Sequence, residues 1–400
     1  MRLFLVIFAA TCFLGENVTD NLGINRNIFQ MVILLMGFIL MANHKTLFSC
    51  FNSLKQLLIL TIVFSIFKLV FDQSDGTRAL VLSVIGAPLL FASFPIYRKP
   101  RMRQTFCKSI FNIFIIFYLV ETLLAIYETA SGHTVFGYLG KSEQLEAFEA
   151  AVFRSTALMG HPLYNALIVS LAMAFFLTSR LKNKYKISLW LIGFASILCF
   201  NTRGSIAVNV LMFLVFVSKE LFFNKKISGN KKITLIAVAS CVFLFGAYLI
   251  FVAGLGGRLF ALDLQDDWSA QTRIDVWRIF NYVDIDTYIF GCSSDQILSL
   301  MHKANLIAIE NFWIDWLLRF GIIFFALYLW LFGRLFVRLF KNYKKFDYLY
   351  IVGSFLLVAS VNCSLSSSFI AVFLFLVCCI IFTPQVFTDI IPDKYLEKNE

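Results

Sequence analysis

Residues 312–333 read FWIDWLLRFGIIFFALYLWLFG, an apolar run in which only Asp315 and Arg319 are ionisable. The hydrocarbon core of a bilayer is about 30 Å thick, so roughly 17 to 25 apolar residues in a helix are needed to cross it. The run therefore predicts a membrane-spanning helix. Asp315 and Arg319 stand four residues apart, a spacing at which opposite charges pair on one helix face. We expect a self-neutralising pair, with a functional role as the alternative.

Similar runs recur along the whole chain. It is 60% hydrophobic and 15% charged, against about 45–50% and about 25% in soluble domains, which excludes a soluble or a disordered protein. The run over 3–15 is counted as a short span and not as a secretory signal, because no small-residue cleavage site follows it. With 312–333, the twelve predicted spans are 3–15, 28–43, 56–71, 79–97, 106–127, 156–178, 186–200, 204–218, 233–253, 347–362 and 367–382.

The formal net charge of +11 is explained by topology. Lys and Arg accumulate in short cytoplasmic loops, and here they gather near residues 98–108, 180–186, 219–232 and 334–345. The intervening segments 128–155 and 254–310 are acidic. We therefore expect both termini in the cytoplasm and six outward loops, and no nucleic-acid partner.

The outward segment 254–310 is long for a connection without function. Residues 271–283 have the apolar spacing of a short amphipathic helix, and Ser293 with Gln296 forms a capping-box signature for another. This predicts an all-α polytopic membrane protein with about twelve helices. It has three regions: an N-terminal bundle (1–253), a large outward loop with short helices (254–310), and C-terminal helices with a tail (311–400). The nine Cys show no metal-ligand spacing, and no cofactor is expected.

Ionisable residues near the bilayer are functional candidates by default. Glu121 lies within a predicted span and serves either a cavity or a hydrogen bond to a neighbouring helix. Arg154 and His161, seven residues apart, are expected on one helix face, with interfacial anchoring as the alternative. Arg203 lies in a short outward turn against the positive-inside pattern. The candidates from the outward loop, whose guanidinium groups suit a phosphate or diphosphate, are Arg258, Arg273, Arg278, His302 and Glu310.

Four segments, in order, resemble motifs of the polytopic O-antigen polymerase and O-antigen ligase superfamily. Arg154 with Gly160-His161-Pro162 is similar to an Arg followed by Gly-His-Pro at a span start. Asn201-Thr202-Arg203-Gly204-Ser205 resembles the family's Ser-Arg-Gly turn. Arg273 to Arg278, followed by Ile289-Phe290-Gly291, resembles an Arg-x-x-x-Trp helix and its glycine turn. Glu310-Asn311, with Gly321 beyond, resembles the start of a long span.

The sequence departs from the family at two places. The family's loop often ends in His-Asn, on which ligases rely, whereas this chain has Glu310; and its Gly-x-Gly turn is reduced to Gly291-Cys292-Ser293. Both departures favour a polymerase over a ligase.

The resemblance implies a GT-C-like fold in the bacterial inner membrane. It also implies an enzyme that uses no metal and joins glycans carried on undecaprenyl diphosphate at the periplasmic face. Partners would be these lipid-linked glycans and the bilayer, with a chain-length regulator and a flippase. Glu310 would orient or deprotonate the acceptor, and Arg203 and Arg273 would bind the diphosphate. Supporting contacts would come from Arg154, His161, Arg258, Arg278, His302 and Asn311.

Two alternatives stay open. A ligase that transfers finished polymer to lipid A core or another acceptor shares nearly every feature. A multi-span transporter shares the helix number, but transporters place binding groups near the midplane on broken helices. Glu310 has its own alternative, since a carboxylate at that position also suits the helix dipole as an N-cap.

Overall fold

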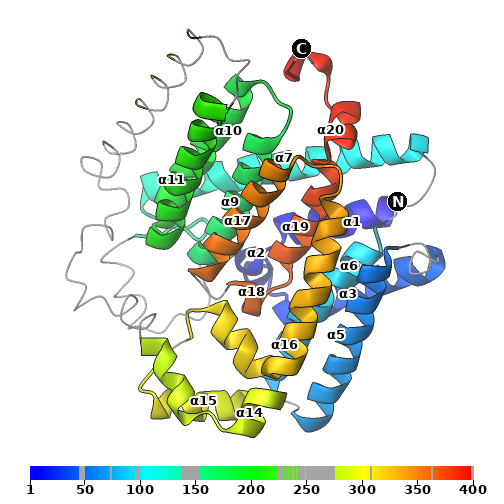
Figure 1. Cartoon of the computed structure of the whole chain (residues 1–400), viewed down its shortest axis with the longest axis vertical. Coiled ribbons are helices and arrows are strands. Elements are labelled where there is room, and N and C mark those ends of the chain that lie inside the picture. The colour runs from blue at the N-terminus through cyan, green and yellow to red at the C-terminus, as the bar shows by residue number, and fades with distance from the viewer. Residues whose placement is uncertain are drawn as a thin grey trace.

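The computed structural model describes residues 1–44, 50–72, 74–94, 100–136, 153–223, 275–306, 309–361 and 364–397, with isolated positions between 224 and 274. Within these residues the fold is all-helical, and only one isolated β-bridge occurs, between Leu181 and Leu396. The α-helices (Figure 1) are α1 (Arg2–Phe13), α2 (Glu16–Asn21), α3 (Arg26–His44), α5 (Asn52–Phe71), α6 (Asp75–Ala92), α7 (Pro100–Ser131), α9 (Pro162–Thr178), α10 (Asn183–Phe200), α11 (Arg203–Ser218), α14 (Ile285–Phe290), α15 (Ser294–Lys303), α16 (Phe312–Leu339), α17 (Lys345–Ser360), α18 (Ser364–Ser367), α19 (Ile370–Ile381) and α20 (Pro384–Ile390). Three further turns are helical: η2 (Lys219–Phe223), η4 (Val276–Tyr282) and η5 (Asp393–Tyr395).

Helices occupy eleven of the twelve predicted spans, and the remaining one, 233–253, lies outside the described residues except for isolated positions. In the part of the chain that the structure describes, four helices are long and apolar enough to cross a membrane: Asn52–Phe71, Arg103–Ser131, Arg203–Phe222 and Phe312–Leu339. A fifth is added if α19 and α20, bent by 76° at their junction, form one span. The other helices are shorter; α19, with 12 residues, reaches about 18 Å at 1.5 Å per residue.

Two helices form the centre of the bundle. Every residue of α19 is buried, and so is α9 from Tyr164 to Leu177, which is the pattern of a helix surrounded on all sides. Phe382, just beyond α19, contacts the rings of Phe175 and Phe176 on α9, with centroids 5.2 and 5.6 Å apart. The outer helices α3, α5 and α16 expose large apolar side chains, among them Leu35, Ile62 and Ile323.

The helix predicted over 312–333 is present as α16, but it breaks at Gly321, whose φ of 71° and ψ of 161° are not helical. Only glycine adopts this conformation without strain. A Cβ on Gly321 would lie 2.3 Å from the carbonyl oxygen of Ile289, and a Cβ on Gly291 would lie 2.3 Å from that of Arg319. The two glycines therefore let the main chains of α16 and of the turn after α14 pack directly against each other.

The described part of the outward loop, residues 275–306, forms a small unit that we call the cap. Figure 1 shows α14 and α15 lying across the lower end of α5 and α16. Its own apolar cluster, which includes Val276, Ile279, Ile297 and Leu300, continues onto Ile314 and Leu318 of α16. The predicted capping box at Ser293 and Gln296 is confirmed. Of the predicted amphipathic helix over 271–283, residues 276–282 form a 3-10 helix, and 271–274 lie outside the described residues.

Two polar contacts fasten the cap to the end of α5. The buried ammonium of Lys68 donates to the carbonyl oxygen of Cys292 at 3.2 Å, and the main-chain N–H of Ser294 donates to the carboxylate of Asp72 at 3.1 Å. Burial would raise the pKa of Asp72, but hydrogen bonds from Thr77, Ser74 and Ser294 outweigh it and lower the pKa to about 2. Asp72 is therefore ionised at neutral pH and holds the first turn of α15.

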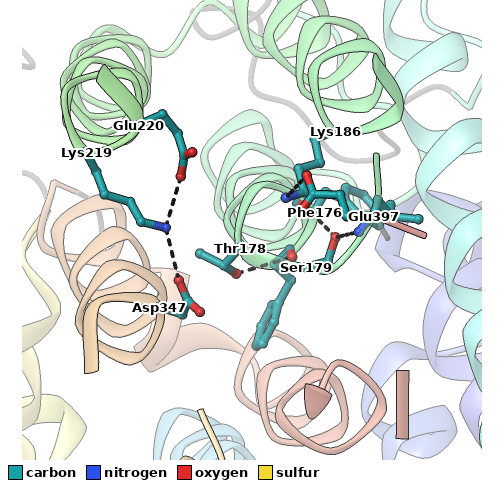
Figure 2. A network of polar contacts seen from close by, with 10 residues as sticks. Phe176, Thr178, Ser179, Lys186, Lys219, Glu220, Asp347 and Glu397 are labelled. Carbon is teal, nitrogen blue, oxygen red and sulfur yellow. Dashed lines mark hydrogen bonds and ion pairs between the residues drawn. The ribbon is translucent and has the colours of Figure 1, made fainter. Parts of the chain in front are cut away.

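The opposite end of the bundle carries ion pairs between basic and acidic side chains (Figure 2). The ammonium of Lys219 lies 3.2 Å from Glu220 and 3.7 Å from Asp347 of α17, and that of Lys186 lies 3.1 Å from Glu397. These lysines belong to two of the loops predicted to be cytoplasmic. The basic residues of the α9–α10 and α11 ends thus gather at the end away from the cap.

We predict that Gly321→Ala destabilises the protein by more than about 1–3 kcal/mol, the usual cost of a side chain in such a conformation, because its Cβ also collides with Ile289. Thermal unfolding of the purified protein in detergent measures this. Gly333→Ala, on the same helix with no atom near its Cβ, is the control and should unfold at or slightly above the wild-type temperature. Equal unfolding temperatures for the two variants would contradict the packing of Gly321 against Ile289.

Candidate functional site

The segment Phe153–His161 is an irregular loop that leads into α9. The predicted helical face shared by Arg154 and His161 is wrong, since α9 begins only at Pro162 with His161 as its N-cap. A residue before proline disfavours helical geometry, and Ala157 and Gly160 have positive φ angles of 38° and 86°. The predicted span 156–178 is correspondingly shorter.

Two carboxylates of α7 hold this loop from within the bundle. Glu128 accepts hydrogen bonds from the Ser155 hydroxyl at 2.6 Å and from the N–H groups of Thr156 and Ala157 at 3.1 and 3.0 Å. Its other oxygen accepts from the N–H of Val135 at 2.8 Å. Two helical turns earlier on α7, the carboxylate of Glu121 accepts a hydrogen bond from the N–H of Leu158 at 3.2 Å. Both glutamates are fully buried. The segment that Glu121 bonds is the loop before α9, whereas the sequence predicted a neighbouring helix or a cavity.

Two asparagines hold the loop from other sides. The amide nitrogen of Asn165 donates to the carbonyl oxygen of Thr156 at 2.6 Å, and that of Asn17 donates to the Thr156 hydroxyl at 2.9 Å. Both asparagines are fully buried. Because α2, α7 and α9 all bind the same few residues, the loop has one defined position.

That position brings Arg154 to the turn that carries Arg203. The Nε of Arg154 donates to the carbonyl oxygen of Phe200 at 3.3 Å, and the N–H of Ser155 donates to that of Cys199 at 3.2 Å. The α10 helix ends there at Asn201, in the left-handed conformation with φ 51°, which closes helix ends. Arg203 follows as the first residue of α11 and is half-buried.

The start of α16 reaches the same region through the end of α17. A Cβ on Gly204 would lie 2.8 Å from the Val361 side chain, so these residues are in direct contact. The neighbouring Ser360 accepts a hydrogen bond from the indole N–H of Trp313 at 2.8 Å. Asn311 is the N-cap of α16 and accepts from the N–H groups of Trp313 and Ile314. The N-cap is therefore not Glu310, which lies half-buried immediately before it.

The N-termini of three helices adjoin these segments, and their N-caps are His161 for α9, Thr202 for α11 and Asn311 for α16. Helix N-termini carry partial positive charge and unpaired N–H groups, which favour bound anions. At α11 the N-cap Thr202 makes no side-chain capping bond. The buried hydroxyls of Thr202 and Ser205 have no hydrogen-bond partner within the described structure.

The remaining predicted site residues are not brought to this region. Arg278 is mostly exposed on the cap and pairs with Asp275 at 3.0 Å, while His302 is exposed in the last turn of α15. Arg258 and Arg273 lie outside the described residues. The predicted pair of Asp315 and Arg319 is confirmed at 2.7 Å.

A small cavity lies beside the 153–161 loop. Its volume is about 20 Å³, room for about one water molecule, so a sugar does not fit inside. It is lined by Thr11, Leu14, Glu16, Thr19, Phe29, Gln30, Ile33, Met159, Tyr164, Ser368, Phe369 and Ile370.

Sequence reasoning missed four of the residues that build this region: Asn17, Glu128, Asn165 and Ser360. A signal existed for Glu128, which stands seven residues after Glu121 and so lies on the same helix face. The other three are common polar residues in or beside apolar runs, and only their burial distinguishes them.

We predict that Glu128→Ala lowers the yield and thermal stability of the protein sharply, because three buried donors, those of Ser155, Thr156 and Ala157, lose their acceptor at about 1–3 kcal/mol each. Leu123→Ala, an exposed position on the same helix, is the control and should behave like wild type. Yield and unfolding temperature are measured in the same detergent. A Glu128→Ala protein with wild-type stability would contradict the role of this carboxylate.

Comparison with protein-family models found none that matches this chain, and a search among curated proteins also found no match. The geometry of the residues therefore carries the inference about function. Arg154 contacts the turn that carries Arg203, and Gly204 and Ser360 connect that turn to the start of α16, which Glu310 precedes.

Proposed function

We propose that this chain is a membrane glycosyltransferase that joins oligosaccharide repeat units carried on undecaprenyl diphosphate into O-antigen, capsule or exopolysaccharide. The observation that carries the proposal is the contact of Arg154 with the Phe200–Arg203 turn, where α11 begins. Arginine offers paired donors and a permanent charge to phosphate oxygens. We name the region formed by Arg154, Arg203, Glu310 and Asn311 the arginine site.

The proposed reaction needs a leaving group and a base. The oxygen of an acceptor hydroxyl forms a bond to the anomeric carbon of the donor, and the bond from that carbon to the diphosphate oxygen breaks. The electron pair leaves with the diphosphate, whose charge is stabilised by Arg203 and by the N-terminus of α11. The proton of the hydroxyl passes to the carboxylate of Glu310.

The proposed placement is the bacterial inner membrane, with about twelve spans, both termini in the cytoplasm and the arginine site facing the periplasm. Lys186 and Lys219, whose ion pairs Figure 2 shows, belong to loops at the end of the bundle away from α14 and α15 (Figure 1). This supports the orientation, because basic loops stay in the cytoplasm. A site at the outer boundary lets the lipid carrier approach from the bilayer while the glycan extends outward.

A transporter is the alternative from another class, and the break in α16 at Gly321 is a feature that transporters use. In transporters the freed main chain at such a break lines a substrate cavity. Here the N–H of Cys292 donates to the carbonyl oxygen of Leu318 at 2.7 Å, and Gly291 packs on Arg319. The cap occupies the break, which favours a structural role for it.

We predict that Arg203→Ala lowers polymer formation by about 10²–10³ without loss of the protein from the membrane. The variant is expressed in a strain that lacks the gene, and the surface polysaccharide is run on a gel. A polymerase defect leaves single repeat units on the anchor, whereas a ligase defect leaves none and accumulates lipid-linked polymer. The control is Arg78→Ala, an exposed arginine of α6; wild-type chain lengths in the Arg203 variant rule out its role.

We predict that Glu310→Gln lowers turnover by about 10²–10⁴, the range for loss of a general base, and leaves thermal unfolding unchanged because Asn311 caps α16. Polymerisation by the purified protein with lipid-linked repeat units measures turnover across pH. If Glu310 has only a structural role, the Glu310→Gln variant unfolds at a lower temperature and the pH profile of its turnover matches that of wild type.

A further inference from the structure

The cap exposes apolar side chains of unusual size. Exposed fractions are 61% for Trp277, 77% for Ile285, 36% for Tyr288 and 56% for Phe290. Water-facing surfaces rarely carry large apolar side chains side by side unless they bind something.

Ring contacts through Phe280 join two of these residues, Trp277 and Tyr288, in one patch. The rings of Trp277 and Phe280 lie 5.9 Å apart, and Phe280 stacks on Tyr288 at 5.7 Å. Ile285 is three residues before Tyr288 on α14, so both side chains lie on one face of that helix. We call Trp277, Phe280, Ile285 and Tyr288 the aromatic edge of the cap. Val276 and Ile279, which alternate with its residues, are fully buried in the cap's own cluster.

The cap is fastened where the lipid-facing stripe of α5 ends. Ile59, Val63, Ile66 and Val70 are 59–68% exposed and recur at helical spacing along α5, one of the helices long and apolar enough to cross a membrane. Phe71, 74% exposed, ends that helix. The next residue, Asp72, binds the N–H of Ser294, and Lys68 binds Cys292, two residues after the exposed Phe290. The apolar surface of α5 therefore meets the cap at the level where the hydrocarbon core ends.

The composition of the aromatic edge fits this level. Trp and Tyr concentrate at the boundary between hydrocarbon and water, because each combines an apolar ring with a polar group. Charged residues that stay in water flank the edge: Asp275, Arg278, Asp284 and Asp286 are all on η4 and α14 or beside them. Sugars stack on flat rings, and Ile285, the most exposed residue of the edge, offers none.

We propose that the aromatic edge inserts into the headgroup region of the leaflet on the cap's side, so that the cap lies on the bilayer as a peripheral element and does not project into water. The partner is phospholipid, contacted by Trp277, Ile285 and Tyr288 at a depth of about 5–10 Å into the boundary. This inference requires only that α5 crosses the membrane, and it stands apart from the proposed enzymatic activity.

The test places an environment-sensitive fluorophore at Ile285→Cys in the full chain, reconstituted in phosphatidylcholine and phosphatidylglycerol vesicles. The control is Ser299→Cys, an exposed polar position on α15, and signal from the native cysteines is subtracted using labelled wild type. The seven cysteines within the described residues are buried. We expect blue-shifted emission at position 285, and about a twofold loss of it with lipids that carry a quencher near the headgroup. Emission at position 299 should be quenched by aqueous iodide instead.

A second label at Trp277→Cys repeats the measurement from the other end of the edge. Iodide quenching at both 285 and 277, with no effect of the lipid quencher, would overturn the proposal. Emission that shifts only when soluble polysaccharide is added would overturn it in favour of a glycan-binding surface. Lipid quenching at both positions supports it.

Discussion

Four donors converge on the carboxylate of Glu128: the hydroxyl of Ser155 and the main-chain N–H groups of Thr156, Ala157 and Val135. A buried carboxylate costs free energy unless its oxygens are hydrogen-bonded, and hydrogen bonds to a charged acceptor are the stronger kind. The contact fixes the loop before α9, and the loop in turn sets Arg154 against the end of α10. The position of Arg154 therefore depends on a residue of α7 that lies outside the arginine site.

Polar contacts also fix the positions of helices along their axes in this phenylalanine-rich core. Apolar packing is non-directional, so a fully apolar helix such as α19 has little to fix its position along its own axis. Hydrogen bonds near the helix ends supply that position: the Tyr164 hydroxyl donates to Ser368 at 2.9 Å next to α19, and Lys219 pairs with Asp347 at the other end of the bundle. The helices are thus held laterally by rings and axially by polar side chains.

Apolar length and charge distribution were enough to predict most helices, and local spacing was enough for the capping box at Ser293 and the pair of Asp315 and Arg319. These features depend on residues close in sequence. The prediction of a helix around Arg154 is wrong. The loop there takes its shape from Glu128 and Asn17, which are distant in sequence and could not be paired with it from the sequence alone. The break at Gly321 has the same origin, since one glycine in an apolar run is ordinary until its partner Gly291 is known. The structure brings Arg154 to the turn that carries Arg203, and no sequence pattern separates these two residues from the exposed Arg278 and His302.

The crossing of Gly291 and Gly321 has a consequence for biogenesis. The chain is made from its N-terminus, so the turn at Gly291 leaves the ribosome before the residues on which it rests, Arg319 to Gly321. Lys68 and Asp72 are in place much earlier and can hold the cap loosely from the α5 side. The surface on which Gly291 packs exists only after α16 has been synthesised. Docking of the cap onto α16 therefore follows the synthesis of that helix.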